Sequence, residues 1–125
     1  MTQEDKQLLL KDLCGRLPYG VIIKHKDEHG KSIDARLVGY NGDWFNYYID
    51  DLCFHLKIHE FKPYLRPMSS MTEEEGLIAE EMGCETTLED WQKANYIDWL
   101  NAHHFDYRGL IEKGLAIDCT GLNIY

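Results

Sequence analysis

The chain changes character within Lys62-Pro63-Tyr64-Leu65-Arg66-Pro67-Met68-Ser69-Ser70-Met71-Thr72-Glu73-Glu74-Glu75. Pro63 and Pro67 fix their own φ angles and lack backbone N–H donors, so we expect this segment to be extended rather than helical. Directly after it, Thr72 and Glu75 have the spacing of a capping box, which predicts the start of a helix. The residues before the segment have a strand-like pattern, and those after it have a helical one.

Residues 1–68 predict one helix followed by a β-meander. Thr2 is expected to cap the helix and Gly15 to end it, with Leu9 and Leu13 on its apolar face. After the helix, apolar and polar residues alternate with a period of two, which is typical of half-buried strands. The expected strands cover residues 21–25, 33–38, 44–49 and 52–59, and a short edge strand covers 64–66.

The strongest hairpin signal is Asn41-Gly42, because this pair accepts the positive φ angles of a type I′ turn. Four or five short antiparallel strands joined by tight turns predict a small barrel-like sheet, for which the SH3-like barrel is the closest common architecture. An open sheet with helices on one face fits the same pattern. Since 125 residues are enough for one core, we expect a single α+β domain over residues 1–125.

Residues 69–125 predict a mainly helical second half. One helix is expected from Thr72 to Gly83, and Thr86 or Thr87 is expected to cap another. The second helix, about 88–103, has a broad apolar face that consists of Leu88, Trp91, Tyr96, Trp99 and Leu100. Because its aromatic residues bury a large area, we expect this to be the main helix of the core.

The net charge of −9 is carried by one half of the chain. Residues 1–68 contain ten acidic and ten basic side chains, whereas residues 69–125 contain twelve acidic and three basic ones. An acidic half repels a phosphate backbone, so direct nucleic-acid binding is disfavoured. Besides solubility, this acidity is compatible with attraction to a basic partner surface and with mimicry of DNA charge.

The cysteines and the N-terminal residues predict the cellular setting. Cys14, Cys53, Cys84 and Cys119 lie more than thirty residues apart and form no C-x-x-C pair, so we expect reduced thiols rather than zinc ligands or a disulfide framework. Residues 1–6 lack the basic start of a signal peptide, and no long apolar run follows them. We therefore expect a cytoplasmic protein without a membrane span.

The densest set of side chains suited to acid–base catalysis or anion binding comprises His103, His104, Asp106 and Arg108. A histidine beside a carboxylate can act as a general base, and an arginine can hold an anionic group. The same spacing is typical of a helix C-terminus, where such side chains bind the last carbonyls, and we favour this interpretation. No motif for nucleotide binding or hydrolase chemistry occurs, so no cofactor is expected.

No metal site is expected from the histidines. His55 and His59 share a strand face, but four strand residues span roughly 13 Å, which is too far for ligands of one ion. His103 and His104 are adjacent on the expected helix and diverge by about 100°.

Aromatic side chains flank the expected hairpin turn and form the best candidate for a binding surface. They are Tyr40, Trp44, Tyr47 and Tyr48, together with Phe45. If the sheet curls, half of them point inward, and the others can form an aromatic groove for an extended or proline-rich peptide. Packing within the core and on the sheet face is the commoner role for such residues.

Two blocks of the sequence resemble a family of short hypothetical proteins of gut-bacterial genomes and their prophages. The blocks are KPYLRPMSSMT at residues 62–72 and DWLNAHHFDYRGLI at residues 98–111. The family has no established activity, so the resemblance implies no catalytic residue. It implies a setting, namely an accessory protein of a mobile element that acts inside a bacterial cell.

The leading functional hypothesis is a non-enzymatic interaction protein that binds another protein, which the sequence does not identify. A small enzyme that uses the His103–Arg108 segment is one alternative. An acidic inhibitor or DNA mimic that acts on a nucleic-acid enzyme is another. The last alternative predicts one exposed acidic face made of Glu73, Glu74, Glu75, Glu80, Glu81, Glu85, Glu89 and Asp90.

Overall fold

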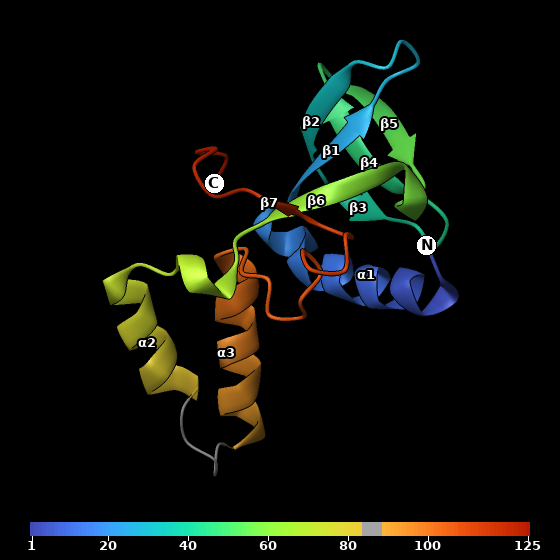
Figure 1. Ribbon diagram of the computed structural model, residues 1–125. Coiled ribbons are helices and arrows are strands. Elements are labelled where there is room, and N and C mark those ends of the chain that lie inside the picture. Colours follow the sequence, from blue (N-terminus) through green and yellow to red (C-terminus); the bar gives the residue numbers. More distant parts are fainter. Residues whose placement is uncertain (84–88) are drawn as a thin grey trace.

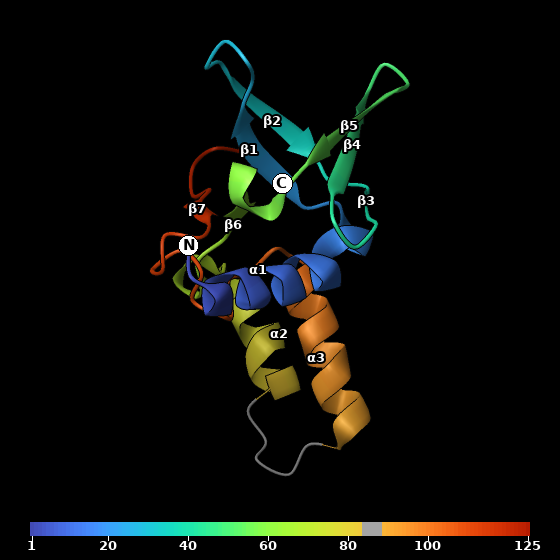
Figure 2. The same cartoon turned by 90° about the vertical axis from the view of Figure 1, so that its right-hand side faces the viewer.

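Two separate sheets form the β part of the computed structural model, which describes residues 1–83 and 89–125 (Figure 1). The first contains β1 (Ile22–Lys26), β2 (Ser32–Arg36), β6 (Phe61–Leu65) and β7 (Ile117–Asp118), in the order β2-β1-β6-β7. The second contains β3 (Gly39–Tyr40), β4 (Phe45–Ile49) and β5 (Leu52–Leu56), in the order β3-β4-β5. The hairpins β1–β2 and β4–β5 splay apart from each other (Figure 2).

Helices complete a mixed α+β architecture that begins with a helix, as the sequence predicts. The α-helices of the described ranges are α1 (Gln3–Arg16), α2 (Glu73–Gly83) and α3 (Asp90–Ala102). Short 3-10 turns are η1 (Leu17–Tyr19), η2 (Ile58–Glu60) and η3 (Met68–Ser70). Helix α1 lies across one end of the sheets, whereas α2 and α3 lie side by side and project away from them (Figures 1 and 2).

Helix α1 begins where the sequence predicts but does not end at Gly15. The hydroxyl oxygen of Thr2 accepts a hydrogen bond from the Asp5 N–H at 3.1 Å, and the Asp5 carboxylate accepts one from the Thr2 N–H at 3.4 Å. Gly15 lies inside the helix, and a Cβ atom there would lie 3.2 Å from Nδ2 of Asn101. The glycine therefore permits close packing of α1 against α3 instead of ending the helix.

The sheets do not close into the SH3-like barrel expected from the sequence, within the residues described. The chain passes from the first sheet to the second at Leu37 and Val38, whose N–H groups donate to the carbonyls of Val21 and Asn46 at 3.0 and 2.8 Å. Between β5 and β6 the turn η2 intervenes, and these strands are not paired. The edge of β6 that faces away from β1 pairs with β7, so it does not complete a barrel.

Strand β6 is an interior strand, which corrects the expected edge position of residues 64–66. It pairs with β1 on one side and with β7 on the other. Pro63 stands opposite Ile23 of β1, and β7 pairs only with Tyr64 and Leu65, beyond the proline. The missing N–H of Pro63 is therefore not required for pairing with β7.

The type I′ geometry expected at Asn41-Gly42 occurs at the next hairpin instead. Gly42 has a φ of 101°, but Asn41 does not have a positive φ, and its side chain caps the turn. Between β4 and β5, Asp50 and Asp51 have φ angles of 47° and 69°. Both central residues thus take the left-handed conformation that a type I′ turn requires, which aspartate tolerates better than most residues.

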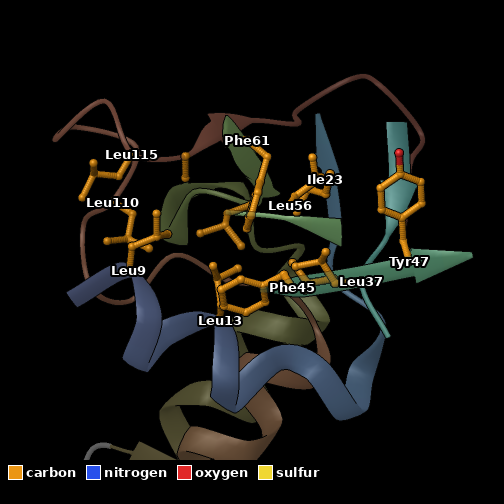
Figure 3. Close-up of a cluster of buried hydrophobic side chains, with 13 residues drawn as sticks. Leu9, Leu13, Ile23, Leu37, Phe45, Tyr47, Leu56, Phe61, Leu110 and Leu115 are labelled. Atoms are coloured by element: carbon orange, nitrogen blue, oxygen red, sulfur yellow. The ribbon is translucent and has the colours of Figure 1, made fainter. Parts of the chain in front are cut away.

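The hydrophobic core lies between the two sheets and α1 (Figure 3). Leu9 and Leu13 of α1 are fully buried, as their spacing predicts. Phe45 of the second sheet and Phe61 of the first meet edge to face, with ring centroids 5.4 Å apart. This contact fixes one sheet against the other, because aromatic pairs in this geometry add to the energy of apolar burial.

Helix α3 is not the main helix of the core. Leu100 near its C-terminus is 2% exposed, whereas Trp91 near its start is 65% exposed. Only the end of α3 that meets α1 is buried, and the chain after Ala102 consists of turns and β7. The caps expected at Thr86 or Thr87 lie outside the described residues. In the structure, Glu89 and Gln92 form the capping box of α3.

The segment between the two prolines is joined to α2 by an ion pair. Two N–H groups of Arg66 donate to the Glu75 carboxylate, at 2.6 and 2.9 Å. Glu75 also accepts a hydrogen bond from the Thr72 N–H at 3.0 Å, and Thr72 accepts one from the Glu75 N–H at 3.2 Å. The capping box that the sequence predicts is therefore confirmed, and its glutamate also binds Arg66.

Glu75 makes the stability of the protein depend on pH. Hydrogen bonds from Arg66 lower the pKa of the Glu75 carboxyl from 4.5 to about 2. Because the pKa is lower in the folded state, the stabilisation is present at neutral pH and is lost as the pH falls from about 5 towards 2. For Glu75→Gln we expect a loss on the order of 2 kcal/mol in the free energy of unfolding at neutral pH, and a flatter pH dependence, in urea titrations.

The exposed neighbour Glu74 provides the matched control. Glu74→Gln removes the same charge from the same helical turn, and it should change the free energy of unfolding by less than about 0.5 kcal/mol. Equal pH profiles for the two variants would contradict the role of Glu75.

Candidate functional site

Tyr40 and Trp44, two of the four aromatic residues predicted to bind a partner, line a hollow of about 470 Å³. The hollow lies between α1 and the second sheet, and we call it the α1–Trp44 groove. Its other wall-forming side chains include Lys6, Gln7 and Leu10 of α1, and Lys57, Ile58 and His59 at the end of β5 and in η2. Its size falls within the range of ligand pockets in proteins.

The loop before β4 holds Trp44 at the groove. The side-chain oxygen of Asn41 accepts hydrogen bonds from the N–H groups of Asp43 and Trp44, at 3.1 and 2.9 Å. The Tyr40 hydroxyl donates to the carbonyl of Gly42 at 2.7 Å. These bonds fix the loop locally and hold the Tyr40 ring and the backbone of Trp44 in place.

The aromatic rings of the groove differ in their surroundings. Tyr40 stacks on Phe45 with ring centroids 4.5 Å apart, and it is therefore supported by the core. Trp44 is 37% exposed, and the Lys57 ammonium lies 5.0 Å from the centre of its ring. An exposed tryptophan beside a cation is able to bind an apolar side chain and an adjacent negative charge together.

The other two predicted binding residues lie elsewhere. Tyr47 is buried in the core, where its hydroxyl lies 2.8 Å from Nε2 of His25 and its ring stacks on Phe54. Tyr48 points to the opposite face of β4 and is exposed. The structure therefore brings Tyr40 and Trp44 together at the groove and separates Tyr47 and Tyr48 from it.

The sequence gives little sign that α1 forms one wall of the groove. Lys6 and Gln7 carry no motif, and their position opposite Trp44 results from packing between segments some forty residues apart. Lys57 is detectable in principle, because the antiparallel pairing of β4 with β5 places Trp44 and Lys57 next to each other beyond the pair Phe45 and Leu56.

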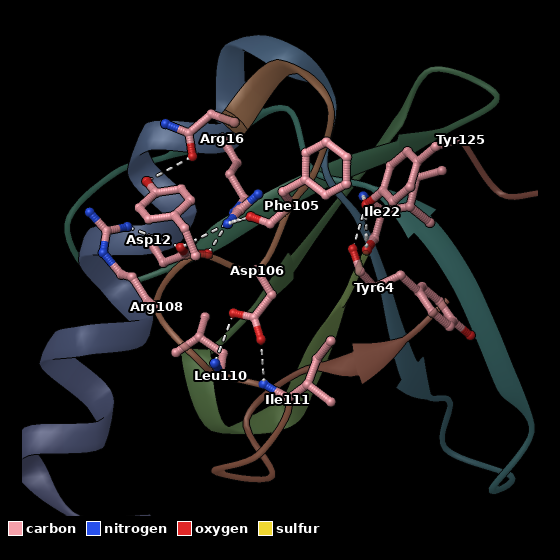
Figure 4. A network of polar contacts seen from close by, with 12 residues as sticks. Asp12, Arg16, Ile22, Tyr64, Phe105, Asp106, Arg108, Leu110, Ile111 and Tyr125 are labelled. Atoms are coloured by element: carbon pink, nitrogen blue, oxygen red, sulfur yellow. Dashed lines mark hydrogen bonds and ion pairs between the residues drawn. The ribbon is translucent and has the colours of Figure 1, made fainter. Parts of the chain in front are cut away.

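The His103–Arg108 segment is the second candidate site, and Figure 4 draws its Phe105, Asp106 and Arg108. Asp106 is buried, and its two carboxylate oxygens accept hydrogen bonds from the N–H groups of Leu110 and Ile111 at 2.8 and 3.0 Å. A carboxylate bound in this way stabilises the following turn. The imidazole of His103 donates from Nδ1 to the carbonyl of Trp99 at 2.9 Å, at the end of α3.

Arg108 belongs to a buried network centred on Asp12 of α1 (Figure 4). Asp12 and Arg16 have fully buried side chains and pair at 2.7 Å, and Arg108 donates to the same carboxylate at 3.0 Å. Arg16 also donates to the carbonyl of Phe105 at 2.6 Å. The Tyr107 hydroxyl donates to Asn101 at 2.9 Å. The network thus ties α1 to the end of α3 and to the segment after it.

His104 differs from its neighbours, because its side chain forms no hydrogen bond with any residue of the ranges 1–83 and 89–125. It has a φ of 63° and is 7% exposed, and its ring stacks on Tyr125 with centroids 3.5 Å apart. Burial, together with the positive charges of Arg16 and Arg36, lowers the pKa of His104 to about 4. His104 is therefore neutral at physiological pH.

Among the described residues there is neither a cluster of potential metal ligands nor a helix suited to spanning a membrane. No three His, Cys, Asp or Glu side chains of residues 1–83 and 89–125 gather as potential metal ligands. None of the helices in these ranges is both long enough and apolar enough to cross a membrane. Comparisons of the sequence and the structure with protein-family models, curated proteins and solved structures find no match.

The buried carboxylate of Asp12 should be essential for stability. Replacing it with alanine leaves Arg16 and Arg108 without their common partner, and for Asp12→Ala we expect a loss of about 3–5 kcal/mol in the free energy of unfolding. Urea denaturation monitored by circular dichroism measures this loss. Glu4→Ala, an exposed acid on the same helix, should change stability by less than about 0.5 kcal/mol.

Asp12→Asn separates the effect of charge from that of packing. It keeps the shape of the side chain but removes the negative charge, so its destabilisation should approach that of Asp12→Ala. If the free energy of unfolding of Asp12→Asn instead lies within about 1 kcal/mol of that of the original protein, the ion pairs of Asp12 do not contribute substantially to stability.

Proposed function

We propose that this chain is a non-enzymatic protein-interaction module that binds an extended segment of another protein in the α1–Trp44 groove. The observation that carries the proposal is the placement of Trp44. Its ring is exposed at a preformed hollow and lies beside the Lys57 ammonium. Tryptophan is one of the residue types enriched among those that contribute most of the binding energy at protein interfaces.

The charges of the groove suggest what the partner segment carries. Lys6 and Lys57 face the hollow, with one acidic residue, Asp43, among its lining side chains. Leu10 and the rings of Tyr40 and Trp44 supply apolar surface. The best-matched ligand is therefore an extended peptide with an aromatic or aliphatic side chain next to one or two acidic residues.

The order of the strands is consistent with an SH3-like interpretation of the fold. The meander changes sheet after β2, turns through η2 and returns beside β1. In our proposal this is an SH3-like connectivity in which the sheets stay open. SH3 domains bind extended peptides in aromatic-lined grooves, and this analogy favours the same mode of recognition here.

The alternative enzymatic function has weaker support. Asp106 and Arg108 are engaged by internal hydrogen bonds, and a general base or an anion-holding arginine needs its side chain available to a substrate. The acidic-inhibitor alternative requires an exposed carboxylate at Glu75, which is paired with Arg66. An interaction protein needs neither a catalytic side chain available to a substrate nor an exposed carboxylate at Glu75.

The proposal includes the setting that the sequence resemblance implies. The module acts inside a bacterial cell, as an accessory protein of a mobile element, and its partner is another protein in the cytoplasm. An extended, acidic partner segment is available in many proteins, because such segments remain disordered until they bind.

Selection from a random-peptide phage library tests the proposed recognition. We expect the selected peptides to carry acidic residues beside an aromatic or aliphatic one. In calorimetric titration, Trp44→Ala should weaken the binding of a selected peptide by about thirtyfold, since truncating a central tryptophan typically costs about 2 kcal/mol. Lys57→Glu should weaken the same peptide by reversing the charge at the groove.

Trp91 of α3 offers a matched control, because it is an exposed tryptophan away from the groove. Trp91→Ala should leave peptide affinity unchanged. The proposal fails if the library yields no peptide that binds saturably, or if Trp44→Ala binds the selected peptides as tightly as the original protein does.

A further inference from the structure

A second hollow lies where β2, the end of α3 and the C-terminal residues meet. Its volume is about 370 Å³, and we call it the Arg36 hollow. It is lined by Gly20, Arg36, Arg66, Ala102, His103, His104 and Tyr125. It shares no residue with the α1–Trp44 groove, so a ligand here and a peptide there do not compete for the same side chains.

Gly20 leaves room for the Arg36 side chain at the hollow. A Cβ atom on Gly20 would lie 2.7 Å from Nη1 of Arg36 and 3.1 Å from its Cδ. The φ of Gly20 is also 70°, a conformation that other residues rarely adopt. The guanidinium therefore lies over a surface that only glycine leaves open, and Arg36 as a whole is exposed.

Arg36 is the cation of this region that has no acidic partner. Asp12 neutralises Arg16, and Glu75 neutralises Arg66. No carboxylate of residues 1–83 and 89–125 lies within ion-pair distance of Arg36, and no hydrogen bond of its side chain is formed there. Asp34, two residues along β2, accepts a hydrogen bond from the Tyr64 hydroxyl at 2.7 Å instead.

His104 is a buried side chain of the hollow with several cations around it. Burial is the main cause of its lowered pKa, and Arg16, Arg36, His103 and Arg66 lower that pKa further. Its Nδ1 atom is buried and has no hydrogen-bond partner among the residues described, and the same is true of Nη1 of Arg16. Buried polar atoms without partners are rare in native proteins and call for an explanation.

Arg36 and His104, whose buried Nδ1 atom finds no partner among the described residues, both line the hollow. The hollow combines the guanidinium of Arg36, two histidines and the ring of Tyr125, whose hydroxyl already donates to the carbonyl of Tyr64 at 2.8 Å. Guanidinium groups bind phosphate and carboxylate groups through paired N–H donors. The volume of the hollow is at the lower end of the range for small-molecule sites.

We propose that the Arg36 hollow binds the phosphate or carboxylate group of a small molecule. Arg36 is the main residue that contacts this group, and His104 and His103 lie beside it. A long polyanion such as nucleic acid is disfavoured, because the acidic helices α2 and α3 repel it. Bound negative charge offsets the repulsion between the surrounding cations, so binding should raise the pKa of His104.

Nuclear magnetic resonance titration of the full chain tests this proposal. Inorganic phosphate and acetate are added in separate experiments at about pH 7, with sodium chloride added to a third sample at matched ionic strength. We expect saturable shifts of the amide signals of Gly20, Arg36 and His104 with phosphate or acetate and not with chloride. The anion that saturates at the lower concentration identifies which of the two groups the hollow prefers.

Arg36→Gln should weaken anion binding at least tenfold and abolish the upward shift of the His104 pKa, followed through its imidazole carbon signals. Lys31→Gln is the matched control, since it removes one exposed cation from the β1–β2 hairpin outside the hollow. Its anion affinity should equal that of the original protein.

Dispersed amide spectra for both variants show that each is folded. Shifts that never saturate, or a saturating affinity that Arg36→Gln leaves unchanged, would overturn the proposal. An equal loss of anion binding in Lys31→Gln and Arg36→Gln would also overturn the proposal, because the loss would then result from the change in net charge and not from Arg36 itself.

Discussion

Backbone hydrogen bonds of Leu65 and Arg66 hold the separate parts of this protein together. The carbonyl of Leu65 accepts from Cys119 N–H at 3.0 Å, while Arg66 donates to the carbonyl of His104 and accepts from Asp106 N–H, both at 2.8 Å. The same strand pairs with β1 on its other side. One extended segment therefore fixes the sheet, the end of α3 and the C-terminal residues relative to one another. The prolines before and after it favour the extended conformation that this role requires.

The buried charges around Asp12 act on the same junction from the side of α1. Arg16 donates to the carbonyl of Phe105, and Arg108 reaches back to Asp12. Unpaired charges in an interior are costly, so the shared carboxylate of Asp12 stabilises both arginines. This shared contact places Arg108 in the interior network and leaves His103 and His104 at the Arg36 hollow. A set of polar residues that looks like one site in the sequence is thus divided between structural support and the proposed ligand site.

Local features of this fold could be predicted from the sequence, and long-range ones could not. The capping boxes at Thr2 and Thr72 and the buried spacing of Leu9 and Leu13 depend on residues three or four apart, so their patterns are visible in the chain. The exposure of Trp91 and the pairing of β7 with β6 depend on which segments meet in space. Likewise, the sequence singles out Trp44 as a candidate binding residue, but the wall opposite it comes from α1, and no local pattern connects the two.

The uneven distribution of charge constrains what both proposed sites can bind. Lys6 and Lys57 at the groove and Arg36 at the hollow all come from residues 1–68, whereas α2 and α3 carry the acidic excess. At physiological ionic strength, charges more than about 8 Å apart are largely screened, so a net charge of −9 does not prevent an anion from binding at close range. It does disfavour any ligand that extends negative charge along the helices. Small anions and short acidic segments satisfy this constraint, and long polyanions do not.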